Sequence, residues 1–304
     1  MISININNET SKLRDVIVGI AHDFGGVPTI EQCYDPKSKE HVRLGSFPSE
    51  HDCVLAINSL VSVLKKYNVN VYFPQNIIGL NQIFSRDIAF AIEDKLVLPN
   101  IIEARRNEVD AIEEILSQIE EKDVIKMPHN SRAEGGDVIV WNDYIFVGYS
   151  EIEDFEKFTV ARTNRLALDF LVRTFTNKKV IGFELNKSDD DSKNNALHLD
   201  CCFQPIGNDM AILYKGGFKN EKDYKFIIDY FKQENVIELN RQEMYNMYSN
   251  VFSISPKVIV SDKDFLELNN KLRRRGFTVE EVAYSEIGKM SGLFRCSTMP
   301  LNRF

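Results

Sequence analysis

The segment Asp137-Val-Ile-Val-Trp-Asn-Asp-Tyr-Ile-Phe-Val147 carries a pattern that recurs along the chain. It starts on an aspartate, runs through an apolar segment, turns at Asn142-Asp143 and continues into a second apolar segment. β-Branched and aromatic residues on both sides of turn-forming residues are typical of a β-hairpin. The same pattern begins again at Asp87 and at Asp200, so the chain is built from repeated units.

Two weaker copies of this hairpin bring the number of units to five. One runs from Val251 to Val260 without a leading aspartate, and an irregular first copy begins near Arg14-Asp15. After each hairpin, apolar residues recur at helical spacing and a short strand-like segment follows. The expected helices cover 51–66, 101–121, 163–177, 221–233 and 262–274, and the expected strands cover 69–73, 124–127, 180–183, 236–239 and 277–282.

The unit is therefore strand, strand, helix, strand, and no single unit could bury its own apolar faces. We expect residues 1–304 to form a single α/β domain of five ββαβ units around a pseudo-fivefold axis. A lone aspartate before a strand is most often a turn residue. Because Asp87, Asp137 and Asp200 occupy equivalent places, we instead expect them to converge on one pocket.

Composition limits the classes of partner. The net charge is −8 and there is no Lys/Arg-rich stripe, which argues against nucleic acid and an anionic membrane surface and favours a small cationic ligand. No apolar run approaches the ~20 residues of a membrane span, and no secretory signal is evident, so a cytoplasmic location is expected. The five cysteines show no paired spacing for a structural zinc site and are expected to be reduced.

Three further segments carry residues suited to catalysis: Glu134-Gly-Gly-Asp137, His198-Leu-Asp200 and Cys296-Ser-Thr298. Each is weak alone. A glycine pair often marks only a tight bend, a histidine is often a core residue, and a cysteine is often a small buried apolar group. A metal site is disfavoured because only one histidine lies in these segments.

Taken in order with Ser85-Arg86-Asp87 and Arg162-Thr163-Asn164, these segments resemble the guanidino-group-modifying superfamily. It includes arginine deiminases, dimethylarginine dimethylaminohydrolases and glycine amidinotransferases. The resemblance covers about residues 80–304. It implies a five-bladed α/β propeller, a small cationic guanidino substrate, and no metal or cofactor.

The resemblance also implies roles for individual residues. Cys296 would attack the guanidinium carbon to form a covalent thiouronium, and His198, held by Glu134, would protonate the leaving amine and then activate water. The residues implied to bind substrate are two carboxylates that grip its N–H edges, Asp87 and Asp200, together with Asp137 and, for an α-carboxylate, Arg162.

The leading prediction is hydrolysis of arginine or an N-substituted arginine to a ureido product such as citrulline. Glu-Gly-Gly-Asp at 134–137 favours a hydrolase, because amidinotransferases of this superfamily typically carry Asp-Ala-Ala-Asp. Two alternatives stay open: transfer of the amidino group to an amine, and a non-catalytic propeller that binds a partner. Residues 22–48 are expected to form a long loop of the kind that acts as a lid. A homo-oligomer is compatible with these features.

Overall fold

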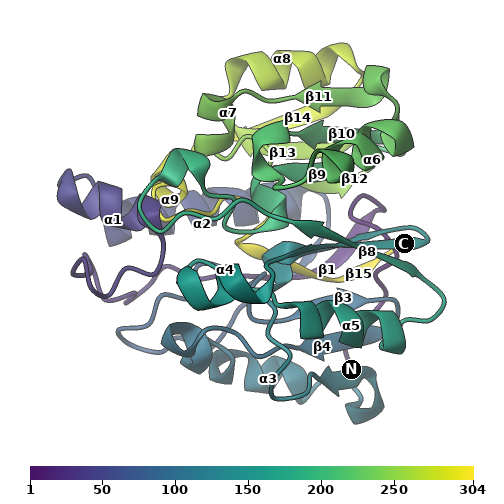
Figure 1. Cartoon of the computed structure of the whole chain (residues 1–304). Coiled ribbons are helices and arrows are strands. Elements are labelled where there is room, and N and C mark those ends of the chain that lie inside the picture. The colour runs from purple at the N-terminus through teal and green to yellow at the C-terminus, as the bar shows by residue number, and fades with distance from the viewer.

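The computed structural model describes residues 1–304 and contains five three-stranded sheets around a common axis (Figure 1). The middle strand of each sheet pairs antiparallel with one neighbour and parallel with the other. The sheets are β15 (Thr298–Arg303), β1 (Leu13–Val18) and β2 (Asn70–Tyr72); β3 (Phe90–Ile92), β4 (Lys95–Leu98) and β5 (Val124–Lys126); β6 (Val138–Trp141), β7 (Tyr144–Tyr149) and β8 (Lys179–Glu184); β9 (Phe203–Ile206), β10 (Met210–Leu213) and β11 (Val236–Glu238); and β12 (Phe252–Ser255), β13 (Val258–Asp262) and β14 (Thr278–Val282). The expected five-bladed propeller is confirmed.

Four of the expected helices are present, as α2 (Glu50–Lys66), α5 (Arg165–Thr174), α6 (Glu221–Phe231) and α8 (Leu266–Arg274). The single helix expected over 101–121 is wrong. That segment consists of 3₁₀ turns at Glu103–Glu108 and Asp110–Ile112, followed by the short α3 (Glu113–Leu116). In a 3₁₀ turn, residues three apart point the same way, and this brings Arg105 and Glu108 together into the interior.

The short helices α1 (Pro36–Arg43), α4 (Ile152–Lys157), α7 (Arg241–Tyr245) and α9 (Ser285–Gly288) were not expected. Of these, α1 lies within the segment 22–48 that was expected to be a loop. No helix is long and apolar enough to cross a membrane.

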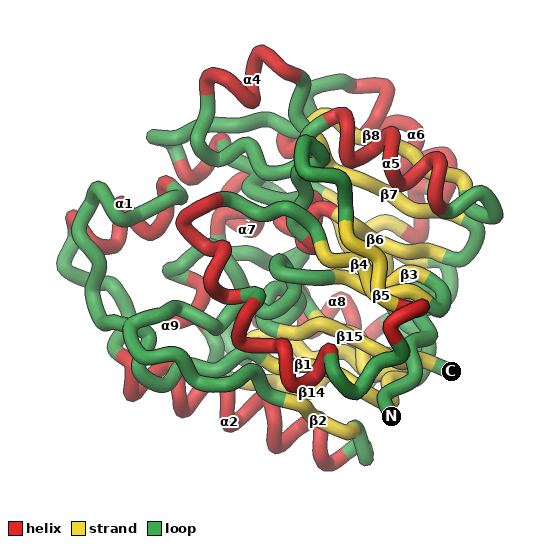
Figure 2. Tube along the Cα trace, turned by 90° about the horizontal axis from the view of Figure 1, so that it is seen from below, coloured by secondary structure: helices red, strands yellow, loops and turns green.

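The irregular first hairpin is also a wrong prediction. The antiparallel partner of β1 is β15, with Leu13 opposite Arg303 and Val18 opposite Thr298. The first sheet is therefore completed by the last strand of the chain, which closes the ring of sheets. A local search for hairpins cannot find such a pair, because its strands are almost 300 residues apart. Both chain ends lie on the same side of the molecule (Figure 2).

Charged groups are buried where the sheets meet. Arg295 is fully buried and donates from Nε and Nη2 to the Glu9 carboxylate at 3.2 and 3.1 Å. Arg86 Nη1 lies 3.9 Å from the same carboxylate. Burial pushes the pKa of Glu9 upward, but Arg295 and Arg86 outweigh burial and lower it to about 2. Glu9 is therefore ionised and stabilises this junction.

We expect Glu9→Gln to lower the free energy of unfolding at pH 7 by about 3 kcal/mol, because the arginines lose their charge partner. The folded pKa of about 2 lies below the unfolded value near 4.5, so the contribution is complete above pH 4.5 and is lost as the pH falls toward 2. Urea unfolding of wild type and Glu9→Gln measures the difference between their free energies of unfolding. This difference should fall to roughly half its pH 7 value at pH 3.

The matched control is Glu113→Gln, because Glu113 is exposed and makes no ion pair. It should leave stability within about 0.5 kcal/mol of wild type at both pH values. An equal gap for Glu9→Gln at pH 7 and pH 3 would contradict the assignment of the effect to ionised Glu9.

Candidate active site

Five residues occupy equivalent places, one to three positions before the first strand of each sheet. They are Cys296 before β15, Asp87 before β3, Asp137 before β6, Asp200 before β9 and Asn250 before β12. All five are buried. The pseudo-symmetry thus gathers these five side chains into one buried polar cluster near the axis, which we call the chamber.

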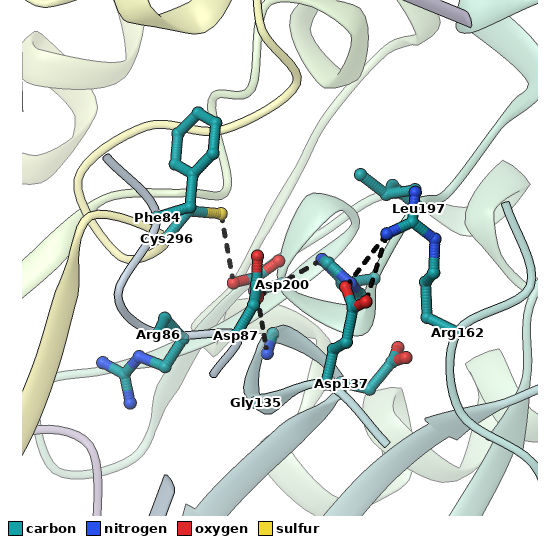
Figure 3. Close-up of polar contacts among 12 residues, drawn as sticks. Phe84, Arg86, Asp87, Gly135, Asp137, Arg162, Leu197, Asp200 and Cys296 are labelled. Atoms are coloured by element: carbon teal, nitrogen blue, oxygen red, sulfur yellow. Dashed lines mark hydrogen bonds and ion pairs between the residues drawn. The ribbon is translucent and has the colours of Figure 1, made fainter. Parts of the chain in front are cut away.

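The Cys296 sulfur points into this chamber toward Asp200 (Figure 3), with 3.6 Å between Sγ and Oδ2. Asn250 Nδ2 lies 3.2 Å from the same sulfur. Burial, followed by the charges of Asp200 and Asp87, raises the pKa of the Cys296 thiol well above its usual range. Without a ligand, Cys296 is therefore a protonated thiol.

His198 lies between two carboxylates. Its Nε2 is 2.8 Å from Glu134 Oε2, whereas its Nδ1 is 3.7 Å from Asp87 Oδ1 and has no hydrogen-bond partner. Burial lowers the pKa of His198, but Asp87 and the hydrogen bond to Glu134 outweigh it and raise the pKa to about 9. The ring is therefore an imidazolium at neutral pH.

Close approach explains the two glycines of Glu134-Gly-Gly-Asp137. A Cβ at Gly136 would lie 2.6 Å from His198 Nδ1 and 2.9 Å from Asp87 Oδ1. A Cβ at Gly135 would lie 2.1 Å from the Arg86 carbonyl oxygen. Only glycine allows the backbone this close to the histidine, and the Gly136 N–H then donates to Asp87 Oδ1 at 3.1 Å.

Asp137 uses both carboxylate oxygens within the protein. Oδ2 accepts from Thr163 Oγ1 at 2.7 Å, and Oδ1 accepts from the Leu199 N–H at 2.9 Å. Asp137 thus ties together the segments that follow Arg162 and His198. Asp137 is one of the five chamber residues, but its hydrogen bonds stabilise the segments around the site.

Arg162, which is 1% exposed, donates from Nη1 to both Glu134 oxygens at 3.1–3.2 Å and from Nη2 to the Tyr34 carbonyl oxygen at 2.7 Å. Its Nε has no partner. Burial pushes the pKa of Glu134 upward, but Arg162 and the bond to His198 hold it well below its usual range. Arg162 therefore keeps Glu134 ionised beside His198.

The sequence analysis missed Arg105 and the role of Arg295. Arg105 Nη1 donates to Asp87 at 2.7 Å, while its Nε and Nη2 grip Glu108 at 2.8 Å each. Arg295 Nη1 donates to Asp200 at 2.9 Å. Both carboxylates expected to grip a guanidinium therefore already contact a guanidinium of the protein. The signals available in the sequence were the 105/108 pair of opposite charge and the arginine directly before Cys296.

Asp87, Glu134 and His198 are the one cluster whose ligand atoms lie near enough together, within 4.8 Å, to hold a metal ion. Their carboxylates also pair with Arg105 and Arg162. Two cationic side chains on these carboxylates oppose a further cation at the same point, so the donor set suits a metal poorly.

Residues of the segment 22–48 contact the site. The Tyr34 carbonyl oxygen accepts from Arg162, and Asp35 accepts a short hydrogen bond from Ser291. A cavity of about 790 Å³ is lined mainly by residues of the same segment, together with Gly79, Leu80, Asn81, Ala104, Glu108 and Thr159. The segment predicted to be a lid thus lines this cavity.

Comparisons with known proteins place the chain in a family. Residues 44–303 match the family model described as N,N dimethylarginine dimethylhydrolase, eukaryotic. The chain is 31% identical to the uncharacterised protein YkgA of Bacillus subtilis (strain 168), over 80% of this chain and 78% of that protein. It is 28% identical to the arginine deiminase of Listeria welshimeri over 73% of this chain, but over only 62% of the deiminase.

Solved structures share the fold. The N-terminal domain of ArgZ, an arginine dihydrolase from cyanobacteria, superposes with a TM-score of 0.78 at 17% identity, over 96% of this chain and 98% of that domain. SxtG, an amidinotransferase from Microseira wollei, superposes with a TM-score of 0.74 at 14% identity, over 99% and 97% of the two chains. The chain belongs to the eukaryotic N,N dimethylarginine dimethylhydrolase family, within the guanidino-group-modifying superfamily.

Proposed function

We propose that the chain is a cysteine-dependent hydrolase of the guanidino group of arginine or an N-substituted arginine. One observation carries the proposal: Cys296 Sγ faces Asp200 and Asp87 in the chamber that also holds the His198–Glu134 pair. A nucleophile, an acid and a pair of carboxylates suited to a planar cation are thus in one place. Membership of the family supports the same reaction class.

The substrate guanidinium would lie between Asp87 and Asp200, with its carbon facing Sγ. It would take the place at Asp87 that Arg105 Nη1 occupies without substrate. The cation would also offset the carboxylate charges that raise the pKa of Cys296, so binding would favour the thiolate. A reactive thiolate would then form mainly when substrate is bound.

The thiolate would attack the guanidinium carbon, and the His198 imidazolium would protonate the leaving nitrogen as the C–N bond breaks. This leaves a thiouronium on Cys296 and a neutral imidazole. That imidazole would take a proton from water, and the hydroxide would attack the same carbon. The C–S bond would then break, and the hydroxyl proton would pass to the departing sulfur, which releases a neutral ureido product and restores the thiol. Asp137 and Glu134 would position the histidine.

The tail of the substrate would reach Arg162 and Arg105. Once a substrate displaces Arg105 Nη1 from Asp87, Nη1 would lie near Glu134 alone, while Glu108 would still bind the other side of Arg105. Two guanidinium groups are suited to an α-carboxylate. We therefore propose an amino-acid substrate, which enters when the segment around Tyr34 moves away.

The first test is a substrate panel of arginine, methylated arginines and agmatine, with mass detection of the product. We expect a ureido product without any added amine, and Cys296→Ser should abolish it because the hydroxyl is a far weaker nucleophile. Cys53→Ser is the control, since Cys53 is a buried core residue of α2 and is not one of the five chamber residues. Product that forms only with an acceptor amine would identify a transferase and contradict the proposal.

The second test concerns the tail. Arg105→Lys should lower kcat/KM for arginine by about 10- to 100-fold, because lysine cannot grip Glu108 and a carboxylate at the same time. Agmatine lacks the carboxylate and should be affected much less. The control is Arg106→Lys, at the exposed neighbouring position. Equal losses for arginine and agmatine would contradict a carboxylate at Arg105.

The third test is the pH dependence. The acid form of His198 is present below its pKa of about 9 and is lost as the pH rises through that value. The alkaline limb of kcat/KM should therefore fall near pH 9. Glu134→Gln removes a negative partner, so the limb should move to lower pH, while Glu113→Gln should not move it. If the alkaline limb of kcat/KM lies at the same pH in Glu134→Gln as in wild type, His198 is not the general acid.

A further inference from the structure

Asn250 occupies, in the fifth sheet, the place that an aspartate occupies in the second, third and fourth. It is fully buried, and the family assignment gives it no role. Its neighbour Ser249 donates from Oγ to the Asp200 carbonyl oxygen at 2.8 Å, which ties the start of the fifth sheet to the fourth. The position of Asn250 at the chamber is therefore fixed from both sides.

The orientation of the Asn250 amide is fixed by the backbone. Oδ1 accepts from the N–H groups of Leu293 and Cys296, both at 3.2 Å. Two donors on one atom identify that atom as the oxygen, so the amide nitrogen is the one that faces Cys296 Sγ at 3.2 Å. A flipped amide would place its N–H groups against two backbone N–H groups.

We propose that Asn250 is a catalytic residue whose amide N–H stabilises the thiolate form of Cys296. The groups whose charges raise the pKa of Cys296 are Asp200, Asp87 and Cys201, and none of them is a cation. Arg295 donates to the same Asp200 oxygen that contacts the sulfur, and not to the sulfur itself. The Asn250 amide N–H would therefore stabilise the Cys296 thiolate before a cationic substrate binds.

The same contact explains why this position is asparagine. Asp200 and Asp87 already place negative charge beside the sulfur, and a third carboxylate would oppose the thiolate further. This inference rests on the proposed function. In that reaction Asn250 would donate to the sulfur twice, first to the attacking thiolate and later to the sulfur that leaves the thiouronium. The amide keeps its protons throughout, so the proton balance of the reaction is unchanged.

The decisive variant is Asn250→Asp. It keeps an oxygen to accept from Leu293 and Cys296, but it replaces the donor to the sulfur with a negative charge. We expect the pKa of Cys296 to rise by roughly one unit or more, which lowers the thiolate fraction about tenfold at a fixed pH below the pKa. The measurement is the rate of alkylation of Cys296 by iodoacetamide across pH, read by peptide mass spectrometry.

The matched control is Asn240→Asp. The Asn240 Oδ1 likewise accepts from two backbone N–H groups, those of Gln242 and Glu243, but its amide contacts no sulfur. It should leave the alkylation profile of Cys296 unchanged. A wild-type profile in Asn250→Asp would overturn the proposal, because it would reduce Asn250 to a support for the backbone.

If Asn250→Asp does not fold by circular dichroism, Asn250→Ala serves instead, since it removes the donor without adding charge. A shift of the profile to higher pH supports the proposal, and an unchanged profile overturns it. Alkylation uses no guanidino substrate. A failed substrate panel would therefore count against the proposed reaction while the thiol titration still tests the role of Asn250.

Discussion

Arg295 is fully buried between the carboxylates of Glu9 and Asp200, and its ion pairs hold the ring of blades together. Arg295 joins Glu9, near the start of the chain, to Asp200 in the fourth blade, and it also donates to the Val138 carbonyl oxygen in the third. A buried charge is costly unless every donor is satisfied, so these elements must all be in place together. Because Cys296 is the next residue, the network that stabilises the ring also positions its thiol.

Charge within the chamber is balanced almost entirely by guanidinium groups. Arg295 neutralises Asp200, Arg105 neutralises Asp87, and Arg162 neutralises Glu134. Such pairs are strong in a medium of low polarity because little water screens them. Each of these three carboxylates thus binds a planar cation that the protein itself supplies.

Local patterns predicted much of the fold. The hairpins β3–β4, β6–β7, β9–β10 and β12–β13 form between neighbouring segments, and their equivalent starts place Asp87, Asp137 and Asp200 near one another. The pairing of β1 with β15 could not be predicted in this way, since it joins distant segments. Arg105 lies on 3₁₀ turns that helical spacing does not describe. Asn250 was not predicted as a site residue, because it occupies the position where the other hairpins have an aspartate. The missing aspartate before this hairpin could have directed attention to the residue in its place.

The order of elements along the chain has a consequence for how the protein is made. During synthesis the carboxylates, His198 and Asn250 are all made before Cys296. β1 can pair with β15 only after residues 298–303 have been made. Cys296 lies two residues before β15, so the pairing of β15 with β1 that closes the ring also brings the thiol to the other four chamber residues.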